Sequence, residues 1–228
     1  SSKLSFCYLQ NNVDFNDGLR PYFFTLFSED PVELKHNHWD FCEDPGRFLY
    51  AFYCARTILG EKNETETEKA LKKLLYMNFN EGDGLNYRPP ESPYGKVRHE
   101  ADLWDNRSVF MGLLLNSILT GDEKARGHAD AMVKALRRVA IKSADGYYYS
   151  KQFYPPGYVP DSSEKPDIGQ NMGGWITPLA KYAGIAKDEQ ALDLARGLSE
   201  FIIKRANITD GRWQGRFNTH SSFFSLAG

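Results

Sequence analysis

Acidic side chains stand where two apolar helices are predicted to begin, and these residues are the ones best suited to chemistry. Asp40 follows Trp39 in the segment HNHWDFCEDPGR, just before one such helix, and Asp105 lies in HEADLWDNR at the start of the next. Two carboxyl groups, one protonated and the other ionised, can act as general acid and general base. We therefore predict that Asp40 and Asp105 are catalytic.

Structural roles compete with catalysis at neighbouring positions. Asp44 followed by Pro45 is typical of an N-cap residue and the first residue of a helix, so capping is the preferred interpretation of Asp44. Asp102 and Asp105 are three residues apart, and either can cap the second helix, which makes one of the two structural. Arg47, one turn after Asp44, is expected to pair with it or with the adjacent glutamate.

Aromatic, basic and amide side chains recur at the same junctions. Large rings fill protein cores, but at a binding surface they stack on flat ligand faces. Arginine, glutamine and histidine side chains hold hydroxyl and carboxylate groups through hydrogen bonds. The predicted substrate-binding residues are His38, Trp39, Arg47, His99, Trp104, Arg107, Tyr158, Gln170, Trp175 and His220. Trp175 keeps the alternative of filling the core.

Three repeated helical hairpins are predicted to position these residues. Each hairpin turns at a glycine (Gly60, Gly121 or Gly184), which suits the left-handed conformation that ends a helix. The first helix of a pair, as in residues 48–59 and 109–119, is apolar nearly all round, whereas the second helix is amphipathic. Because an apolar helix must be buried on every side, this alternation predicts an inner and an outer layer.

Long connections lead from the outer helices back to the next inner helix, over roughly residues 78–104, 143–170 and 207–218. Loops of this length without structure of their own are unusual unless they carry function. Asp-Gly steps at residues 83–84 and 145–146 predict short β-hairpins within them. We expect the long loops to gather above the N-termini of the inner helices and to form a cleft.

The predicted fold class is all-α, an α/α hairpin toroid with short β-hairpins in the long loops. Residues 1–40 form an N-terminal segment that leads into the toroid, and residues 41–228 form about three and a half hairpins. The inner helices are expected to begin near Asp44, Asp105, Asn171 and Thr219. The fourth has no outer helix to cover its apolar face, which predicts a partial toroid and a larger whole.

The junction segments at residues 38–47, 99–107 and 169–175 resemble those of the six-hairpin (α/α)6-toroid glycosidase superfamily, which includes glycoside hydrolases and related polysaccharide lyases. The resemblance covers about residues 41–228 and implies a toroid that acts on an oligo- or polysaccharide. Hydrolysis by Asp40 and Asp105 is the preferred function. The alternatives are a lyase, or a non-catalytic glycan-binding or scaffold protein. The residues suited to lyase chemistry are Tyr94, His99, Arg107, Asn171 and His220.

The composition excludes several other classes of protein. The 228 residues include 28 Lys plus Arg and 30 Asp plus Glu, a balance that argues against nucleic acid as a partner. No apolar run is long enough to span a bilayer. Three cysteines match no zinc pattern, and no phosphate or dinucleotide motif is present, so no metal or cofactor is expected. Secreted, periplasmic and cytoplasmic locations are all compatible with the sequence.

Overall fold

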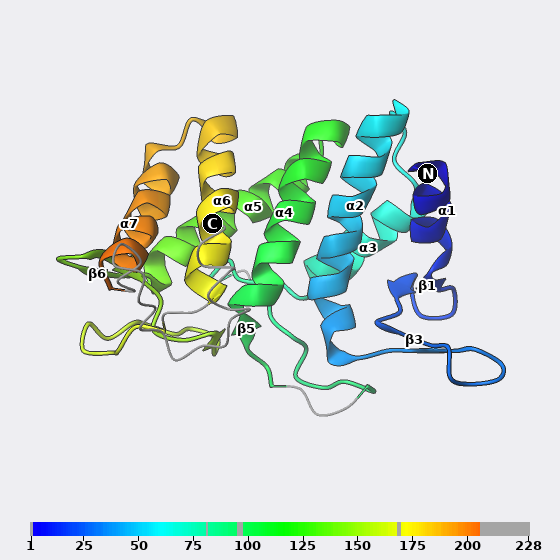
Figure 1. Ribbon diagram of the computed structural model, residues 1–228, viewed down its shortest axis with the longest axis horizontal. Helices are drawn as coiled ribbons and strands as arrows, with labels where there is room; N and C mark the ends of the chain where they lie inside the picture. The colour runs from blue at the N-terminus through cyan, green and yellow to red at the C-terminus, as the bar shows by residue number, and fades with distance from the viewer. Residues whose placement is uncertain (1, 81, 95–97, 168–169, 206–228) are drawn as a thin grey trace. The chain divides into compact units, whose positions relative to one another are not determined.

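The structure is a computed structural model, and it describes residues 2–80, 82–94, 98–167 and 170–205. This part of the chain is mainly α-helical (Figure 1). Its helices are α1 (Ser2–Asn11), the 3-10 helix η1 (His38–Phe41), α2 (Glu43–Leu59), α3 (Glu66–Met77), α4 (Leu103–Thr120), α5 (Glu123–Val139), α6 (Gln170–Ala186) and α7 (Glu189–Arg205). Its strands are β1 (Val13–Asp14), β2 (Arg20–Pro21), β3 (Phe24–Leu26), β4 (Glu33–Lys35), β5 (Ala101–Asp102), β6 (Ile141–Ser143), β7 (Gly146–Tyr148) and β8 (Phe153–Tyr154).

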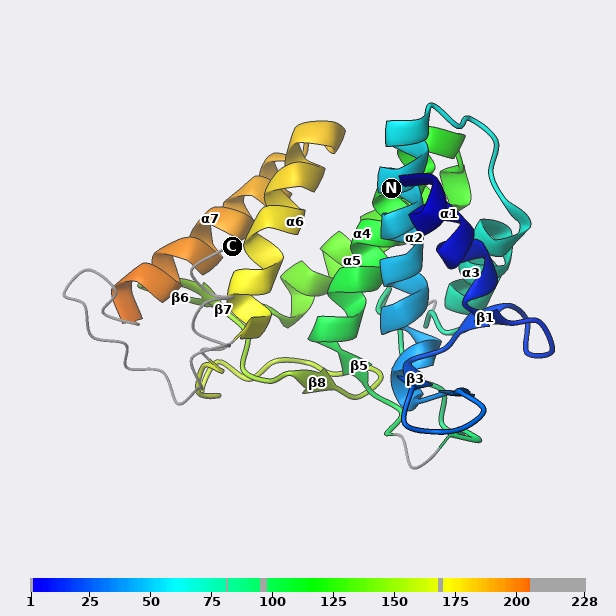
Figure 2. The same cartoon turned by 45° about the vertical axis from the view of Figure 1, so that its right-hand side comes forward.

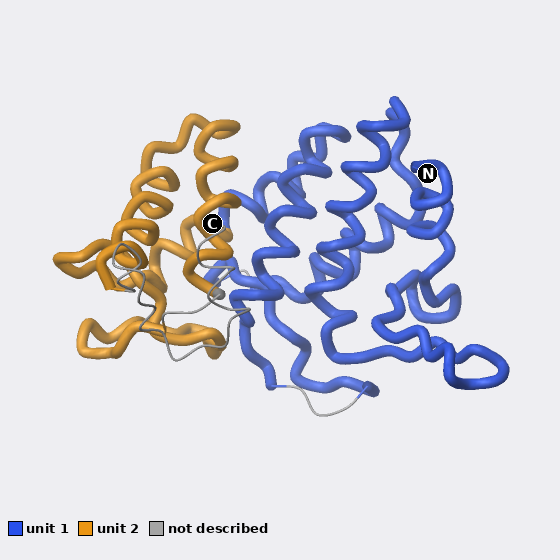
Figure 3. Tube along the Cα trace, viewed as in Figure 1, with its two compact units in different colours: residues 1–131 blue, residues 132–228 orange. Residues whose placement is uncertain are grey.

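Two compact units make up the chain, residues 1–131 and 132–228, and the boundary falls within α5 (Figure 3). The first unit contains the helices from α1 to α4 and the strands from β1 to β5. The N-terminal segment expected over residues 1–40 therefore shares a compact unit with the first helical hairpin. The described part of the second unit contains α6, α7 and the strands from β6 to β8.

The predicted helical hairpins are present, but one of their turns differs from the prediction. Gly60 after α2 has φ 71° and Gly121 after α4 has φ 69°, as expected for glycines that end helices. The role predicted for Gly184 is wrong, because α6 continues through it to Ala186 and Lys187 takes φ 57°. A glycine within a helix costs only about 1 kcal/mol, so the helix extends past it and the turn needs one left-handed residue later.

The core of the first unit lies between α2 and α4, which run side by side in Figures 1 and 2. Leu49 and Phe52 of α2 and Phe110 of α4 are fully buried. The two backbones approach closely where Gly46 of α2 faces α4, since a Cβ atom at Gly46 would lie 2.5 Å from the carbonyl carbon of Ser108. The apolar patterns of α2 and α4 therefore bury these two helices against each other.

Both Asp-Gly steps form turns between paired residues. In the second unit β6 and β7 form an antiparallel hairpin that pairs Ile141 with Tyr148. In the first unit Phe79 and Asn86 form an isolated antiparallel bridge around the other step. The N-terminal segment adds two antiparallel pairs, β1 with β2 and β3 with β4. These pairs belong to the segment from which His36 contacts Asp40 of η1.

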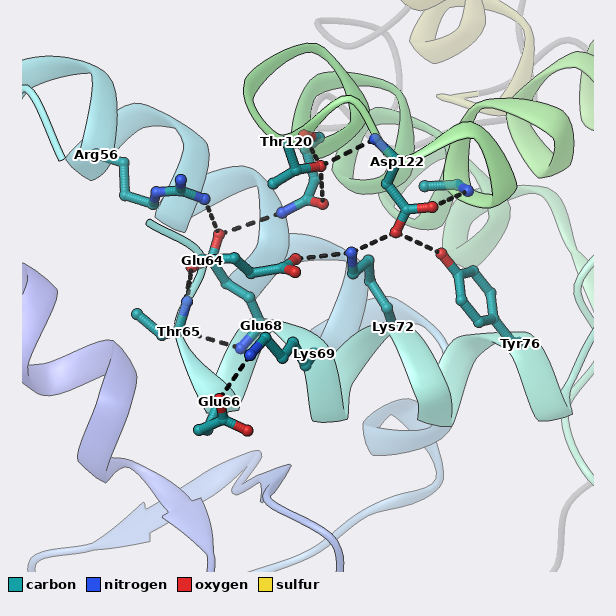
Figure 4. Close-up of polar contacts among 12 residues, drawn as sticks. Arg56, Glu64, Thr65, Glu66, Glu68, Lys69, Lys72, Tyr76, Thr120 and Asp122 are labelled. Carbon is teal, nitrogen blue, oxygen red and sulfur yellow. Dashed lines mark hydrogen bonds and ion pairs between the residues drawn. The ribbon is translucent and has the colours of Figure 1, made fainter. Parts of the chain in front are cut away.

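Polar side chains join the helices at the C-terminal ends of α2 and α4 (Figure 4). Arg56 Nη1 of α2 donates to Glu68 Oε1 of α3 at 2.8 Å, and both side chains are fully buried. Asn116 Nδ2 of α4 donates to the same oxygen at 3.2 Å. Lys72 of α3 pairs with Asp122, the residue just before α5. A buried charge is tolerated when it is paired in this way. The network therefore links α2, α3, α4 and the start of α5 at one end.

No helix among the described residues is long and apolar enough to cross a membrane.

Candidate functional site

The first acidic residues lie where η1 leads directly into α2. Helix α2 begins at Glu43, and its N-cap residue is Cys42, whose side chain makes no capping hydrogen bond. The prediction that Asp44 is the N-cap is therefore wrong, because η1 runs into α2 and the helix starts two residues earlier, at Glu43 instead of Pro45. Asp40 is the N3 residue of η1, and its Oδ2 accepts from the backbone N–H of Asn37, the N-cap residue of η1, at 2.9 Å.

Asp40 and Asp44 form a hydrogen-bonded pair of carboxyl groups. Burial and the neighbouring charge of Asp40 raise the pKa of Asp44 to about 8. Burial also raises the pKa of Asp40, against the opposing effect of its hydrogen bonds with Asn37 and His36. Asp40 Oδ1 is buried, and no N–H group or hydroxyl of the described residues donates to it. A protonated Asp44 carboxyl group would supply such a donor. The larger rise in pKa falls on Asp44, so this carboxyl group holds a proton more tightly than Asp40 does.

A histidine from the N-terminal segment is in contact with the same pair. His36 Nδ1 lies 2.6 Å from Asp40 Oδ2, and His36 Nε2 lies 3.2 Å from Asp14 Oδ2. Its ring stacks between Tyr22 and Tyr94, with centroid distances of 4.5 and 4.6 Å. Sequence reasoning did not include Asp14 or His36 among the site residues. The spacing of four residues between His36 and Asp40 was the available signal, whereas nothing local points to Asp14.

A second set of contacts joins the starts of α2 and α4. Trp104 Nε1 donates to Glu43, and Arg47 forms an ion pair with Glu43, which confirms one of the two expected partners of this arginine. The Arg107 guanidinium lies 4.0 Å from the centre of the Trp104 ring. Burial raises the pKa of Glu43, against the opposing charge of Arg47. Three predicted binding residues, Arg47, Trp104 and Arg107, are thus brought together around a carboxyl group that was not among them.

Asp105 has a different environment from the one expected of a catalytic acid. Arg88 Nε donates to Asp105 Oδ2 at 2.7 Å, and Arg88 Nη2 donates to Asp105 Oδ1 at 3.1 Å. The same nitrogen donates to Asp102 at 2.9 Å, and Asp102 caps α4 by accepting from the Trp104 N–H. Burial and the charge of Asp102 raise the pKa of Asp105, against the pull of Arg88. Arg88 thus contacts both oxygens of Asp105, and Asp44 rather than Asp105 lies beside Asp40.

Other predicted residues of the first unit lie around these two sets. His38 is half-buried and packs on Trp39, with ring centroids 4.2 Å apart. Burial and the charge of Arg88 lower the pKa of His38, which favours the neutral imidazole. His99 is exposed, and its Nδ1 lies 2.7 Å from the carbonyl oxygen of Arg88. His99 also lines a groove of about 400 Å³, together with Met77, Asn78, Phe79, Asn80, Tyr87, Pro89 and Pro90.

The predicted residues of the second unit belong to other surroundings. Tyr158 donates its hydroxyl hydrogen to Glu164, which also accepts from Ser150, so this residue fastens a loop. Trp175 is fully buried, as its alternative core role requires, and has no exposed face for a ligand. Gln170 begins α6, but its side chain lies outside the described part of the structure, and so does His220.

Comparison with protein-family models, curated proteins and solved structures finds no match to this chain. Within the described residues, no group of three or more His, Cys, Asp or Glu side chains is arranged to hold a metal ion. The chemistry that the site offers on its own residues is proton exchange by the Asp40–Asp44 pair. Glu43 adds a third carboxyl group beside it.

The raised pKa of Asp44 predicts that stability falls as the pH rises. A carboxyl group that binds its proton more tightly when folded stabilises the protein at low pH, and this stabilisation is lost as the pH rises toward about 8. Asp44→Asn keeps the donor and removes the titration. The free energy of unfolding of the variant minus that of the wild type should be about 2–4 kcal/mol larger at pH 9 than at pH 5. Urea unfolding at both pH values measures this difference.

The control for this prediction is Asp161→Asn. Asp161 is exposed and the backbone N–H of Ser163 lowers its pKa, so it is ionised throughout this pH range. Its difference from the wild type should stay constant between pH 5 and pH 9. Parallel pH curves for Asp44→Asn and the wild type would contradict a retained proton on Asp44.

Proposed function

We propose that the protein is a glycoside hydrolase-like enzyme that acts on an oligo- or polysaccharide by carboxylate acid–base catalysis. The observation that carries the proposal is the buried, hydrogen-bonded Asp40–Asp44 pair, in which burial and the charge of Asp40 raise the pKa of Asp44 to about 8. Cleavage of a glycosidic bond needs an acid that is still protonated near neutral pH to protonate the leaving oxygen. Asp44 meets this requirement.

The roles of the carboxyl groups follow from their spacing. The two carboxyls of a glycosidase flank the scissile bond at roughly 5–9.5 Å, which is wider than a hydrogen-bonded pair. Asp40 and Asp44 therefore act as one unit, in which Asp44 donates the proton and Asp40 holds it in place. Glu43 is close enough to raise the pKa of Asp44, and we assign to Glu43 the role of the second carboxylate.

Two groups of side chains support a carbohydrate as the ligand. Trp104 is half-buried and carries the Arg107 guanidinium over its ring, while the Arg47 side chain is 50% exposed beside Glu43. The ring suits the flat face of a sugar, and the guanidinium groups suit its hydroxyl or carboxylate oxygens. Trp39, half-buried beside His38, provides a second ring before α2. We also propose that the helical hairpins belong to an incomplete α/α toroid.

The test is turnover of a panel of oligosaccharides by the full chain, measured as released reducing ends. Asp44→Asn should lower kcat at least about 100-fold, because general acid catalysis contributes about 10²–10⁴-fold. Glu43→Gln should cause a comparable loss. The control Asp130→Asn changes an exposed acid paired with Arg126 on α5 and should leave the rate unchanged. Wild-type activity should decline above about pH 8, as Asp44 loses its proton.

Three results would contradict this proposal. Equal rates for Asp44→Asn and the wild type would remove the assigned acid. Accumulation of an unsaturated product that absorbs in the near ultraviolet would indicate a lyase. Tight glycan binding without release of reducing ends would indicate a binding protein.

A further inference from the structure

The N-terminal segment, residues 1–40, contributes a histidine with a buried side chain to the acidic site at the start of α2. The His36 side chain is 8% exposed and the Asp40 side chain is fully buried, whereas Asp14 at the outer end is 18% exposed. His36 contacts Asp14 of β1 through one ring nitrogen and Asp40 of η1 through the other. Asp40 in turn is hydrogen-bonded to Asp44.

Both ring nitrogens of His36 face carboxylate oxygens. An ionised carboxylate accepts hydrogen bonds and donates none, so a ring nitrogen that contacts one must carry a hydrogen. The backbone N–H of Asn16 holds the pKa of Asp14 below its usual range, which keeps Asp14 ionised. Asp40 Oδ2 already accepts the backbone N–H of Asn37, so this oxygen is an acceptor for His36 as well. Between two ionised carboxylates both ring nitrogens of His36 donate, which is the arrangement of an imidazolium.

The imidazolium is held rather than mobile. Transfer of a proton through a histidine, from one nitrogen to the other, needs a flip of the ring or a second exchange before the next cycle. The ring of His36 stacks between Tyr22 and Tyr94, which opposes a flip. The Tyr94 hydroxyl donates in turn to Asp17, and Arg20 pairs with Asp17 at 2.8 Å. These contacts favour a fixed charge beside Asp40 over a proton wire.

We propose that His36 is a positioning residue, an imidazolium fixed between Asp14 and Asp40 that keeps Asp40 ionised and leaves the shared proton of the pair on Asp44. The role rests on the proposed function, in which Asp44 is the acid. It deepens that function by assigning the protonation state of the site to the N-terminal segment. The charged and titratable groups that face His36 are Asp14, Asp17, Arg20, Tyr22, Asp40 and Tyr94.

The test is a pH titration of the aspartate side-chain carboxyls in the full chain, followed by carbon NMR without any substrate. Asp40→Asn and Asp44→Asn assign the two resonances. In His36→Gln, the titration of Asp40 should move upward by about 1–3 pH units, because a cation within hydrogen-bond distance is lost. In Asp14→Asn, the shift should have the same direction and be smaller, since His36 remains but loses one anchor.

The matched control is His128→Gln. His128 is also half-buried between two aromatic rings, with centroids 4.8 Å from Tyr76 and 4.1 Å from Phe79. Loss of a stacked histidine at this site should leave the titration of Asp40 unchanged. An unchanged Asp40 titration in folded His36→Gln would overturn the inference, and Asp14→Asn decides the matter if His36→Gln does not fold. A shifted titration in a protein that cleaves no sugar would uphold the role of His36 and refute the proposed hydrolysis.

Discussion

Gly46→Ala should lower the free energy of unfolding by about 3 kcal/mol or more, because α2 and α4 have no room for a side chain where they cross. A Cβ atom at Gly46 would lie 2.5 Å from both the carbonyl carbon of Ser108 and the backbone nitrogen of Val109. Both are backbone atoms of α4, so no rotation of a side chain can relieve the overlap. The two helices must move apart, and the contacts between them are lost.

Gly112 of α4, which faces Gly46 of α2, allows a second form of the same experiment. A Cβ atom at Gly112 would meet the carbonyl oxygen of Gly46 and would lie 3.0 Å from Leu49 Cβ. Gly112→Ala should therefore destabilise to a similar extent, measured by urea unfolding monitored by circular dichroism. The control is Gly127→Ala in α5, where an added Cβ atom would meet no heavy atom within 4 Å outside its own stretch of helix. This change should stabilise the protein by roughly 0.5–1 kcal/mol, because alanine is the better helix former. Equal effects at Gly46 and Gly127 would contradict close packing of α2 on α4.

Arg88→Met should lower the free energy of unfolding by about 3–5 kcal/mol at pH 7, the range for a buried ion pair that loses one partner. Arg88 is 9% exposed, and its guanidinium serves Asp102 and Asp105, which are 3% and 1% exposed. Without it, the two buried carboxyl groups face each other with no compensating charge, and burial disfavours the ionised form of both. The loss should shrink as the pH falls and both carboxyl groups become protonated.

The ion pair on α5 provides the comparison for Arg88. The side chains of Arg126 and Asp130 are 31% and 40% exposed, and an exposed pair contributes less than about 1 kcal/mol. Arg126→Met should thus change stability by about 0.5 kcal/mol at most. The triple variant with Arg88→Met, Asp102→Asn and Asp105→Asn should recover part of the loss, because it removes the charges that Arg88 neutralised. No recovery would mean that Arg88 acts by filling space.

Local sequence was a good guide where structure depends on neighbours along the chain. The apolar and amphipathic patterns predicted the helical hairpins, and the glycines at 60 and 121 marked their turns correctly. Asp102 was one of two expected caps for α4, and the pairing of Arg47 with Glu43 follows from helical spacing. Each of these features depends on residues fewer than five positions apart. The local pattern of residue types is therefore enough to predict it.

The surroundings of the acidic residues depend on distant residues and were harder to predict. The role of Asp105 is decided by Arg88, which lies 17 residues earlier in a long loop. The environment of Asp40 is decided by His36 and by Asp14, a residue of a β-pair that no periodicity indicated. Asp44 resembled a cap because of Pro45, whereas the 3-10 turn ahead of α2 moved the helix start. The sequence identified the acidic junctions but could not assign their partners.

The network around Glu68 has a consequence for how the first unit opens. One buried carboxylate receives hydrogens from α2 and from α4 while it belongs to α3. None of these helices can separate at this end without leaving a buried charge or amide unsatisfied, which is costly. Local fraying is thus replaced by cooperative unfolding, in which the three helices exchange their amide hydrogens with one common free energy. The acidic site at the other end of α2 and α4 is therefore carried by a single folding unit.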